Sequence, residues 1–195
     1  MLIPVPAALG YPTLGALVFG ESTGLPLPGE TALITAGGLA AAGHLSLPLV
    51  IVVATLAAIA GDTLGYWLGR ERGRAFLLRD GFLAGHRRHA VRRADRFFAR
   101  NGTATVFVSR FIPGVRVVAA VMAGATGMPW RRFAAANMLG AVLWASTVAS
   151  LAYLLGPAGA ASLALAGLAL GPLALTGAWW RRRRTRAREV IGAPA

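Results

Sequence analysis

The sequence RFIPGVR, residues 110–116, interrupts an apolar segment at 103–127 with a Pro-Gly pair between two arginines. An earlier apolar segment at 14–43 has a similar break at Pro28 and Gly29 and also carries acidic side chains. As helices, the halves of these segments are too short to cross a hydrocarbon core of about 30 Å. Non-helical backbone at that depth must be buried in protein or face a watery cavity. We therefore predict that 14–43 and 103–127 are two re-entrant helical hairpins.

Three further apolar segments have the length of a transmembrane helix, about 20 residues. They cover 45–69, 133–155 and 161–180, and only the first contains a charged residue, Asp62. The chain of 195 residues is 56% hydrophobic and 14% charged, whereas soluble domains average about 25% charged residues. We predict an all-α membrane protein that forms a single membrane domain over 1–195.

The basic residues predict which side of the membrane each loop faces. All of them are arginine, and most cluster at 70–100, 131–132 and 181–188, next to apolar segments. Cytoplasmic loops carry an excess of basic residues. We therefore predict a cytoplasmic amphipathic segment at 70–102 and a cytoplasmic basic tail at 181–195. The first hairpin then enters from outside and the second from the cytoplasm, in a multi-pass protein of the cell (inner) membrane.

The predicted elements form an inverted repeat. Each unit is a broken hairpin followed by one transmembrane helix, and the topology inverts the second unit relative to the first. The segment at 161–180 adds a C-terminal transmembrane helix. Inverted repeats with broken helices are typical of secondary transporters, whose substrate site lies near the middle of the membrane. The pattern favours a transporter, and we expect no cofactor.

Five ionisable residues lie inside the apolar segments. Each costs about 2.5–3.5 kcal/mol at the middle of a bilayer, so we expect them to pair or to face a hydrated cavity. Arginine matches phosphate and stays charged when it is desolvated, and three acids against two bases leave one carboxylate free to take a proton. Two interpretations stay open: the charges hold the hairpins together, or they bind a ligand. For Asp62, helix packing stays open beside a functional role. The five residues are Glu21, Glu30, Asp62, Arg110 and Arg116.

The composition excludes several kinds of chemistry. The chain has no cysteine and no lysine, which rules out disulfides, thiol catalysis and lysine Schiff bases. The three histidines, His44, His86 and His89, fall outside the predicted hairpins and spans. We therefore expect no metal site and no enzyme activity. Nucleic acid is not an expected partner, because the basic clusters adjoin membrane-length apolar segments.

Four motifs lie along residues 15–156. They are Glu21 to Glu30 with Pro26, Pro28 and Gly29; Gly61 and Asp62 with Tyr66, Gly69, Arg70 and Gly73; Arg110 to Arg116 with Pro113 and Gly114, followed by Ala123 and Gly124; and Asn137 with Gly140 and Trp144. This combination resembles the DedA family, the bacterial branch of the VTT-domain membrane proteins. The N-terminus departs from the family, whose members often carry a clearer first helix. The motif positions expected to be structural are Pro28, Gly29, Gly61, Tyr66, Gly69, Pro113, Gly114, Asn137 and Trp144.

The resemblance implies two facing hairpins and the translocation of a membrane lipid, driven by a proton or sodium gradient. It implies that Arg110 and Arg116 bind the phosphate of the substrate, that Glu21 and Glu30 also contact and gate it, and that both glutamates and Asp62 couple the ion. The implied substrate of this flippase or scramblase is a polyprenyl phosphate, such as undecaprenyl phosphate, or an anionic phospholipid. The expected partners are thus phosphate-bearing membrane lipids, with a homodimer as an allowed assembly. The alternatives are a membrane-integrity or stress factor without cargo and, less favoured, a membrane lipid phosphatase.

Overall fold

Helices make up every regular element in residues 7–73, 98, 100–112 and 115–191, the part of the chain that the computed structural model describes. The all-α prediction is therefore confirmed for these residues. Most of the predicted cytoplasmic segment at 70–102 lies outside them. Pro113, Gly114 and the end of the tail at 181–195 also lie outside the described residues.

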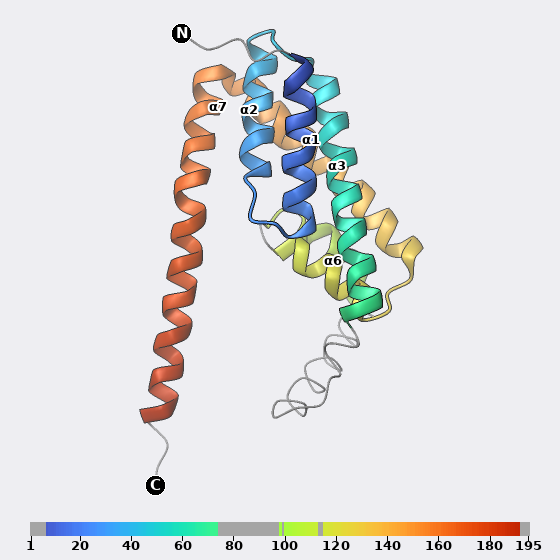
Figure 1. Ribbon diagram of the computed structural model, residues 1–195, viewed down its shortest axis with the longest axis vertical. Helices are drawn as coiled ribbons and strands as arrows, with labels where there is room; N and C mark the ends of the chain where they lie inside the picture. Colours follow the sequence, from blue (N-terminus) through green and yellow to red (C-terminus); the bar gives the residue numbers. More distant parts are fainter. Residues whose placement is uncertain (1–6, 74–97, 99, 113–114, 192–195) are drawn as a thin grey trace.

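Helices α1 (Ala7–Thr23) and α2 (Gly29–Ala41) form an antiparallel pair (Figure 1). The connecting residues 24–28 include two prolines, which cannot donate the backbone hydrogen bonds of a continuing helix. The break at Pro28 and Gly29 thus lies where the sequence places it. Helix α1 starts earlier than the predicted hairpin at 14–43, because Pro12 removes only one helical hydrogen bond and does not end the helix.

Helix α3 (Leu47–Leu68) begins after Ser46 with a proline in its first turn and continues into a short π-helix, η1 (Gly69–Gly73). Among the described residues, two helical stretches are long and apolar enough to cross a membrane, Leu47–Gly73 and Trp130–Leu168. They correspond to the segments predicted at 45–69 and 133–155.

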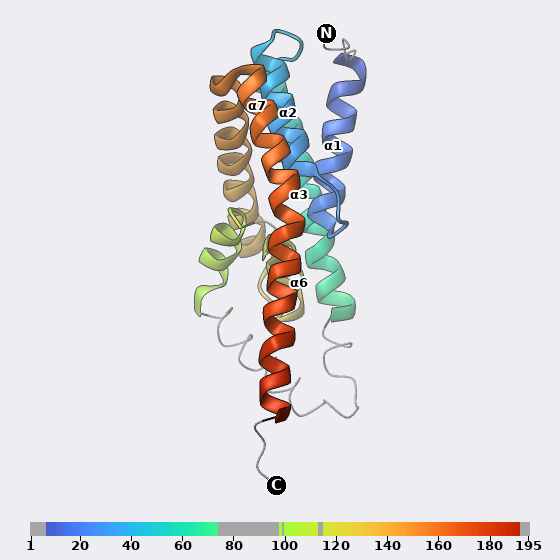
Figure 2. The same cartoon turned by 90° about the vertical axis from the view of Figure 1, so that its left-hand side faces the viewer.

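Helix α7 (Trp130–Ile191) consists of two arms that meet at Gly156. Gly156 has φ 70° and ψ 178°, a conformation that glycine adopts readily, and Pro157 follows it. The second arm returns alongside α2 (Figures 1 and 2). A Cβ on Gly38 would lie 2.6 Å from the Ala160 Cβ, so small side chains set this spacing. The segment predicted at 161–180 is therefore the second arm of α7.

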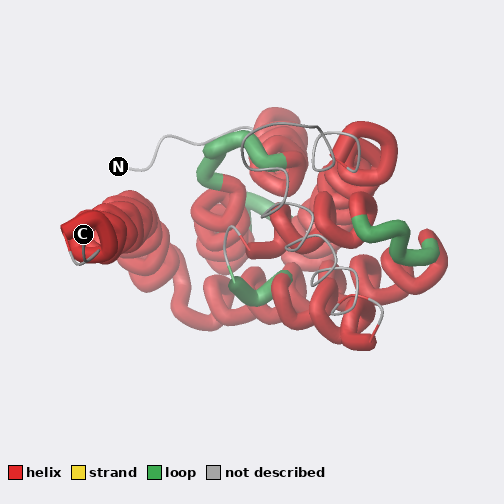
Figure 3. Tube along the Cα trace, turned by 90° about the horizontal axis from the view of Figure 1, so that it is seen from below, coloured by secondary structure: helices red, strands yellow, loops and turns green. Residues whose placement is uncertain are grey.

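Residues 100–109 are helical and precede α6 (Val115–Ala125), which runs back toward the start of α7. Helix α6 crosses α3 so closely that a Cβ on Gly124 would overlap the Tyr66 carbonyl oxygen, and one on Gly69 would overlap the Val121 carbonyl oxygen. Figure 3, a view from below, shows the C-terminal arm of α7 to one side of the other helices.

Two apolar clusters make up most of the core. One joins α1, α2, α3 and α7 and includes Val18, Leu33 and Trp144. The other surrounds Tyr66 and Phe133. Along α3, Asp62 lies between Ala58 of the first cluster and Tyr66 of the second. Asp62 thus lies between two apolar layers, and the connection between α1 and α2 lies near α6 at this level of the molecule (Figure 1).

Candidate functional site

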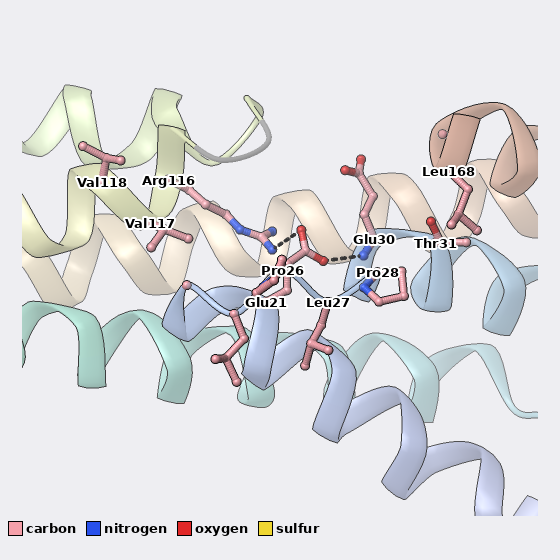
Figure 4. A pocket seen from close by; sticks show the side chains of 13 residues that line it. Glu21, Pro26, Leu27, Pro28, Glu30, Thr31, Arg116, Val117, Val118 and Leu168 are labelled. Atoms are coloured by element: carbon pink, nitrogen blue, oxygen red, sulfur yellow. Dashed lines mark hydrogen bonds and ion pairs between the residues drawn. The ribbon is translucent and has the colours of Figure 1, made fainter. Parts of the chain in front are cut away.

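A cavity of about 640 Å³ lies where the loop of the first hairpin faces α6 and the second arm of α7. We call it the polar chamber, because it contains the charged groups Glu21, Glu30 and Arg116. Its walls combine residues of the 24–28 loop with Val117 and Val118 of α6 and with Gly167 and Leu168 of α7. Residues far apart in the sequence therefore converge on one space (Figure 4).

Glu21 connects three elements around the polar chamber. It lies near the end of α1, and its Oε2 accepts a hydrogen bond of 2.7 Å from the backbone N–H of Glu30 at the start of α2. Its Oε1 lies 2.9 Å from Nη2 of Arg116 on α6 (Figure 4). A carboxylate at this position satisfies a free N–H of the first turn of α2 and complements the helix dipole.

Gly29 makes the contact between Glu21 and α2 sterically possible. A Cβ at this position would overlap Glu21 Oε2 and lie 2.9 Å from both the Leu17 carbonyl oxygen and the Val18 Cα. Only a residue without a side chain lets the start of α2 come this close to α1. Gly29 thus begins α2 and also lets the Glu21 carboxylate reach the first turn of that helix.

Arg116 lies in the first turn of α6, and its side chain is only 4% exposed. Its guanidinium carbon lies 5.0 Å from the centre of the Trp144 ring, within range of a cation–π interaction. Its buried Nε has no hydrogen-bond partner among the described residues. Arg116 therefore combines one ion pair with unused donor capacity beside a cavity.

Glu30 projects from the first turn of α2 into the polar chamber, away from the Glu21–Arg116 pair (Figure 4). Its carboxylate makes no hydrogen bond or ion pair to any residue that the structure describes. The sequence predicts one carboxylate without an arginine, and Glu30 is the residue in this position.

Arg110 and Asp62 form a second ion pair, which does not line the polar chamber. Nη1 and Nη2 of Arg110 each lie 2.7 Å from Asp62 Oδ2, and both residues are 3% exposed. Arg110 Nη1 also donates to Asn137 Oδ1 at 3.2 Å, and Asn137 Nδ2 donates to the Ile59 carbonyl oxygen at 3.4 Å. This network joins Arg110 to α3 and α7.

The structure thus separates the predicted site residues into two groups. It brings Glu21, Glu30 and Arg116 together at the polar chamber and places Arg110 and Asp62 in the buried network.

Most of the other motif residues make packing contacts. The hydroxyl of the fully buried Tyr66 donates to the Met128 carbonyl oxygen at 2.5 Å, and its ring stacks on Phe133 at 4.5 Å. Gly61 packs against Ser22 of α1. Trp144 is an exception, because it contacts the arginine of the chamber. Thr31 and Leu168 also line the chamber, although neither is among the residues predicted from the sequence. For Thr31 the available signal was a threonine in the first turn of a broken half-helix.

The rim of the polar chamber is apolar and exposed. Leu25, Val118 and Leu168 line the cavity, and they are 56%, 60% and 51% exposed. A ligand that enters past this rim therefore meets hydrocarbon surface first and charged groups deeper in the chamber.

Comparisons with known proteins match the chain to one domain family and to several membrane proteins. The family model of the VTT domain matches residues 27–154. The chain is 41% identical to the uncharacterized membrane protein slr0232 of Synechocystis over 73% of this chain and 66% of that protein. It is 35% identical to protein DedA of Escherichia coli K12 over 69% of this chain and 63% of that protein, and 37% identical to the inner membrane protein YghB of the same organism over 74% and 67%. No solved structure gives a significant match.

Proposed function

Because this chain belongs to the DedA family of VTT-domain membrane proteins, we propose that it moves a lipid with a phosphate-bearing head group across the membrane. A polyprenyl phosphate or an anionic phospholipid has this chemistry. The observation that carries the proposal is Arg116, a buried arginine with unused donors beside a cavity whose rim is exposed and apolar. This combination suits a molecule with a charged head and hydrocarbon chains.

Three electropositive groups converge on the polar chamber and support a phosphate ligand: the Arg116 guanidinium and the N-termini of two helices. Arg116 supplies planar N–H donors that match phosphate oxygens. Helices α2 and α6 both begin at the chamber, and helix N-termini attract anions. Glu21 already occupies one of these N-termini, so the chamber holds an internal carboxylate where an anionic head group would compete.

The proposed cycle exchanges ion pairs. The phosphate takes the place of Glu21 on Arg116, and Glu21 keeps its hydrogen bond from the N–H of Glu30. Two carboxylates then face the chamber without an arginine, a state that favours uptake of a proton or a cation by one of them. When the lipid leaves, Glu21 returns to Arg116 and the ion is released. Glu30, which has no partner in the described structure, is the group that we assign to ion coupling.

The proposed arrangement in the membrane follows the charge pattern. The hairpin of α1 and α2 is re-entrant from outside, and the hairpin that contains α6 is re-entrant from the cytoplasm, in an inverted repeat. The arginine-rich tail at 181–195 is then cytoplasmic in a multi-pass protein of the inner membrane. The two Arg–carboxylate pairs would lie near the middle of the bilayer, where transporters of this kind bind substrate.

We also propose that the protein is not a phosphatase. The chamber contains no histidine, and His44, the histidine among the described residues, follows the other end of α2. Phosphate-ester cleavage needs a nucleophile and a general acid positioned at the substrate. Release of inorganic phosphate from a lipid phosphate by the purified protein would contradict this proposal.

The test is lipid movement in vesicles of defined composition that contain the full-length protein. A trace of phosphatidate labelled at its chain reports movement between leaflets through a quencher that cannot cross the membrane. Arg116→Gln is expected to slow movement by roughly tenfold or more, because the substitution removes the charged donor to phosphate. Arg131→Gln, at an exposed arginine outside the chamber, is the matched control and is expected to leave the rate unchanged. Equal rates for the two variants, at equal incorporation, would overturn the proposal.

A further inference from the structure

Two apolar grooves run along opposite sides of α2. The α1–α2 groove has a volume of about 290 Å³ and includes Leu9, Thr13, Ala32 and Ala36. The α2–α7 groove has a volume of about 330 Å³ and includes Gly38, Ala160, Ala161 and Leu165. Thr31, Thr35 and Leu39 line both grooves. These three residues repeat every four positions, so they form one ridge of α2 that separates two spaces of similar size.

Both grooves border the polar chamber. Thr31 lines the chamber and both grooves. Pro28 is shared by the chamber and the α1–α2 groove, and Leu168 is shared by the chamber and the α2–α7 groove. The chamber and both grooves therefore share the first turn of α2 as a wall, and the grooves extend from there away from the charged residues.

The lining of the grooves suits hydrocarbon. It consists of aliphatic side chains, small residues and threonines, and the Thr35 hydroxyl donates to the Thr31 carbonyl oxygen at 2.8 Å within its own helix. The 13 residues of α2 span about 20 Å at 1.5 Å per residue, which covers the roughly 15 Å depth of one hydrocarbon leaflet. Each groove is therefore long enough for the chain of a lipid whose head lies at the chamber.

We propose that the grooves are two tail sites, and that the ligand is a two-chained phospholipid with one acyl chain in each groove. The proposal deepens the proposed function and rests on it. A phosphate at Arg116 places the glycerol backbone near Thr31, which borders both grooves. A lipid phosphate with a single isoprenoid chain would fill one groove and leave the other without a ligand. The position of both grooves beside the chamber and their similar volumes thus favour two chains of similar length.

The experiment compares two ligands with the same head group, phosphatidate with two chains and lysophosphatidate with one. Binding to the full-length protein in detergent is measured for variants that fill one groove at an exposed position, Thr13→Phe for the α1–α2 groove and Ala161→Phe for the α2–α7 groove. Ala60→Phe, at an exposed alanine of α3 outside both grooves, is the matched control.

Phosphatidate is expected to bind the unmodified protein roughly tenfold or more tightly than lysophosphatidate, because a second chain buries many more methylene groups. Each groove variant is expected to lower the affinity for phosphatidate toward the one-chain value, whereas Ala60→Phe is not. Equal affinities for the two ligands, or groove variants that behave like Ala60→Phe, would overturn the proposal of two tail sites. Tighter binding of a long-chain isoprenoid monophosphate than of phosphatidate would also overturn it.

Arg116→Gln separates this proposal from the proposed function. If Arg116→Gln abolishes binding and lipid movement while the groove variants change neither, only the tail sites are wrong. If Arg116→Gln leaves binding and movement unchanged, the proposed function itself fails. Cross-linking of phosphatidate that carries a photoreactive group on one chain provides an independent check, with adducts expected in both α1 and the second arm of α7.

Discussion

The two arginines of the RFIPGVR motif both pair with an acid of the first half of the chain, but in different surroundings. Arg110 directs two N–H groups at one oxygen of Asp62, receives further support from Asn137, and is 3% exposed like its partner. Arg116 makes one contact with Glu21, whose side chain is 18% exposed and lines the polar chamber with it. The same motif therefore supplies one enclosed pair and one pair that borders a cavity.

We infer from this difference that access to the cavity, more than the charge itself, determines whether such a pair can exchange a ligand. Arg110 and Asp62 are buried and do not line the chamber, so a phosphate in the chamber does not meet Arg110. It can reach Arg116 by replacing a single carboxylate. We therefore assign structural stability to the Arg110–Asp62 pair and ligand exchange to the Arg116–Glu21 pair, and three predictions test this division.

The largest effect on stability is expected for Asp62→Ala. The substitution leaves the Arg110 guanidinium buried without its counter-charge, which typically lowers the free energy of unfolding by about 3–5 kcal/mol. Thermal unfolding of the purified protein in detergent, followed by circular dichroism, measures the change.

A double variant, Asp62→Leu with Arg110→Met, removes both charges and keeps apolar side chains of similar size. It therefore separates the effect of an unpaired buried charge from the effect of lost packing. Removing both charges from a buried pair is often neutral or stabilising, so the double variant is expected to be more stable than Asp62→Ala and to move lipid. A stable double variant that moves no lipid would show that Arg110 contacts the substrate, as the family resemblance implies. It would contradict the assignment of a structural role to one pair and a ligand-exchange role to the other.

The intermediate effect is expected for Glu21→Gln. Glutamine retains an oxygen that can accept the Glu30 N–H but loses the charge that holds Arg116, and hydrogen bonds to charged groups contribute about 1.5–3 kcal/mol. We therefore expect the free energy of unfolding to fall by about 1.5–3 kcal/mol. Binding of phosphatidate is expected to become several times tighter, because the internal competitor for Arg116 is gone. Weaker binding, measured with the same detergent-solubilised protein, would mean that Glu21 contacts the head group instead of competing with it.

Much of this arrangement is predictable from the sequence, and the rest depends on tertiary geometry. The breaks near Pro28 and at Gly156 are local, because the backbone chemistry of proline and glycine sets them. The meeting of acids from the first hairpin with an arginine from the second follows from the cost of isolated charges in apolar surroundings. The partner of each arginine does not follow, because it depends on the rotation of α3 and α6 about their axes.

Other features also needed the three-dimensional structure. Arg110 and Arg116 look equivalent in the sequence, and only the packing of α3 shows that Asp62 encloses the first of them. Leu168 lies far from either hairpin in the chain and reaches the chamber because α7 turns back at Gly156. Helix α1 begins at Ala7, since Pro12 is tolerated within it. Contacts between distant segments decide the first two features, whereas the start of α1 depends on the local tolerance of the helix for Pro12.

The smallest effect on stability, and the most specific one on transport, is expected for Glu30→Gln. Because the Glu30 carboxylate has no partner among the described residues, its neutral analogue is expected to change the free energy of unfolding by no more than about 0.5 kcal/mol. Lipid movement without a gradient is expected to continue, whereas its acceleration by a proton or sodium gradient is lost, since glutamine can neither release a proton nor bind the cation as a carboxylate does. Glu71→Gln, at an exposed carboxylate of η1, is the control and should keep the gradient dependence. If Glu30→Gln keeps it as well, the coupling ion acts at Glu21, and the exchange of ion pairs at Arg116 alone accounts for transport.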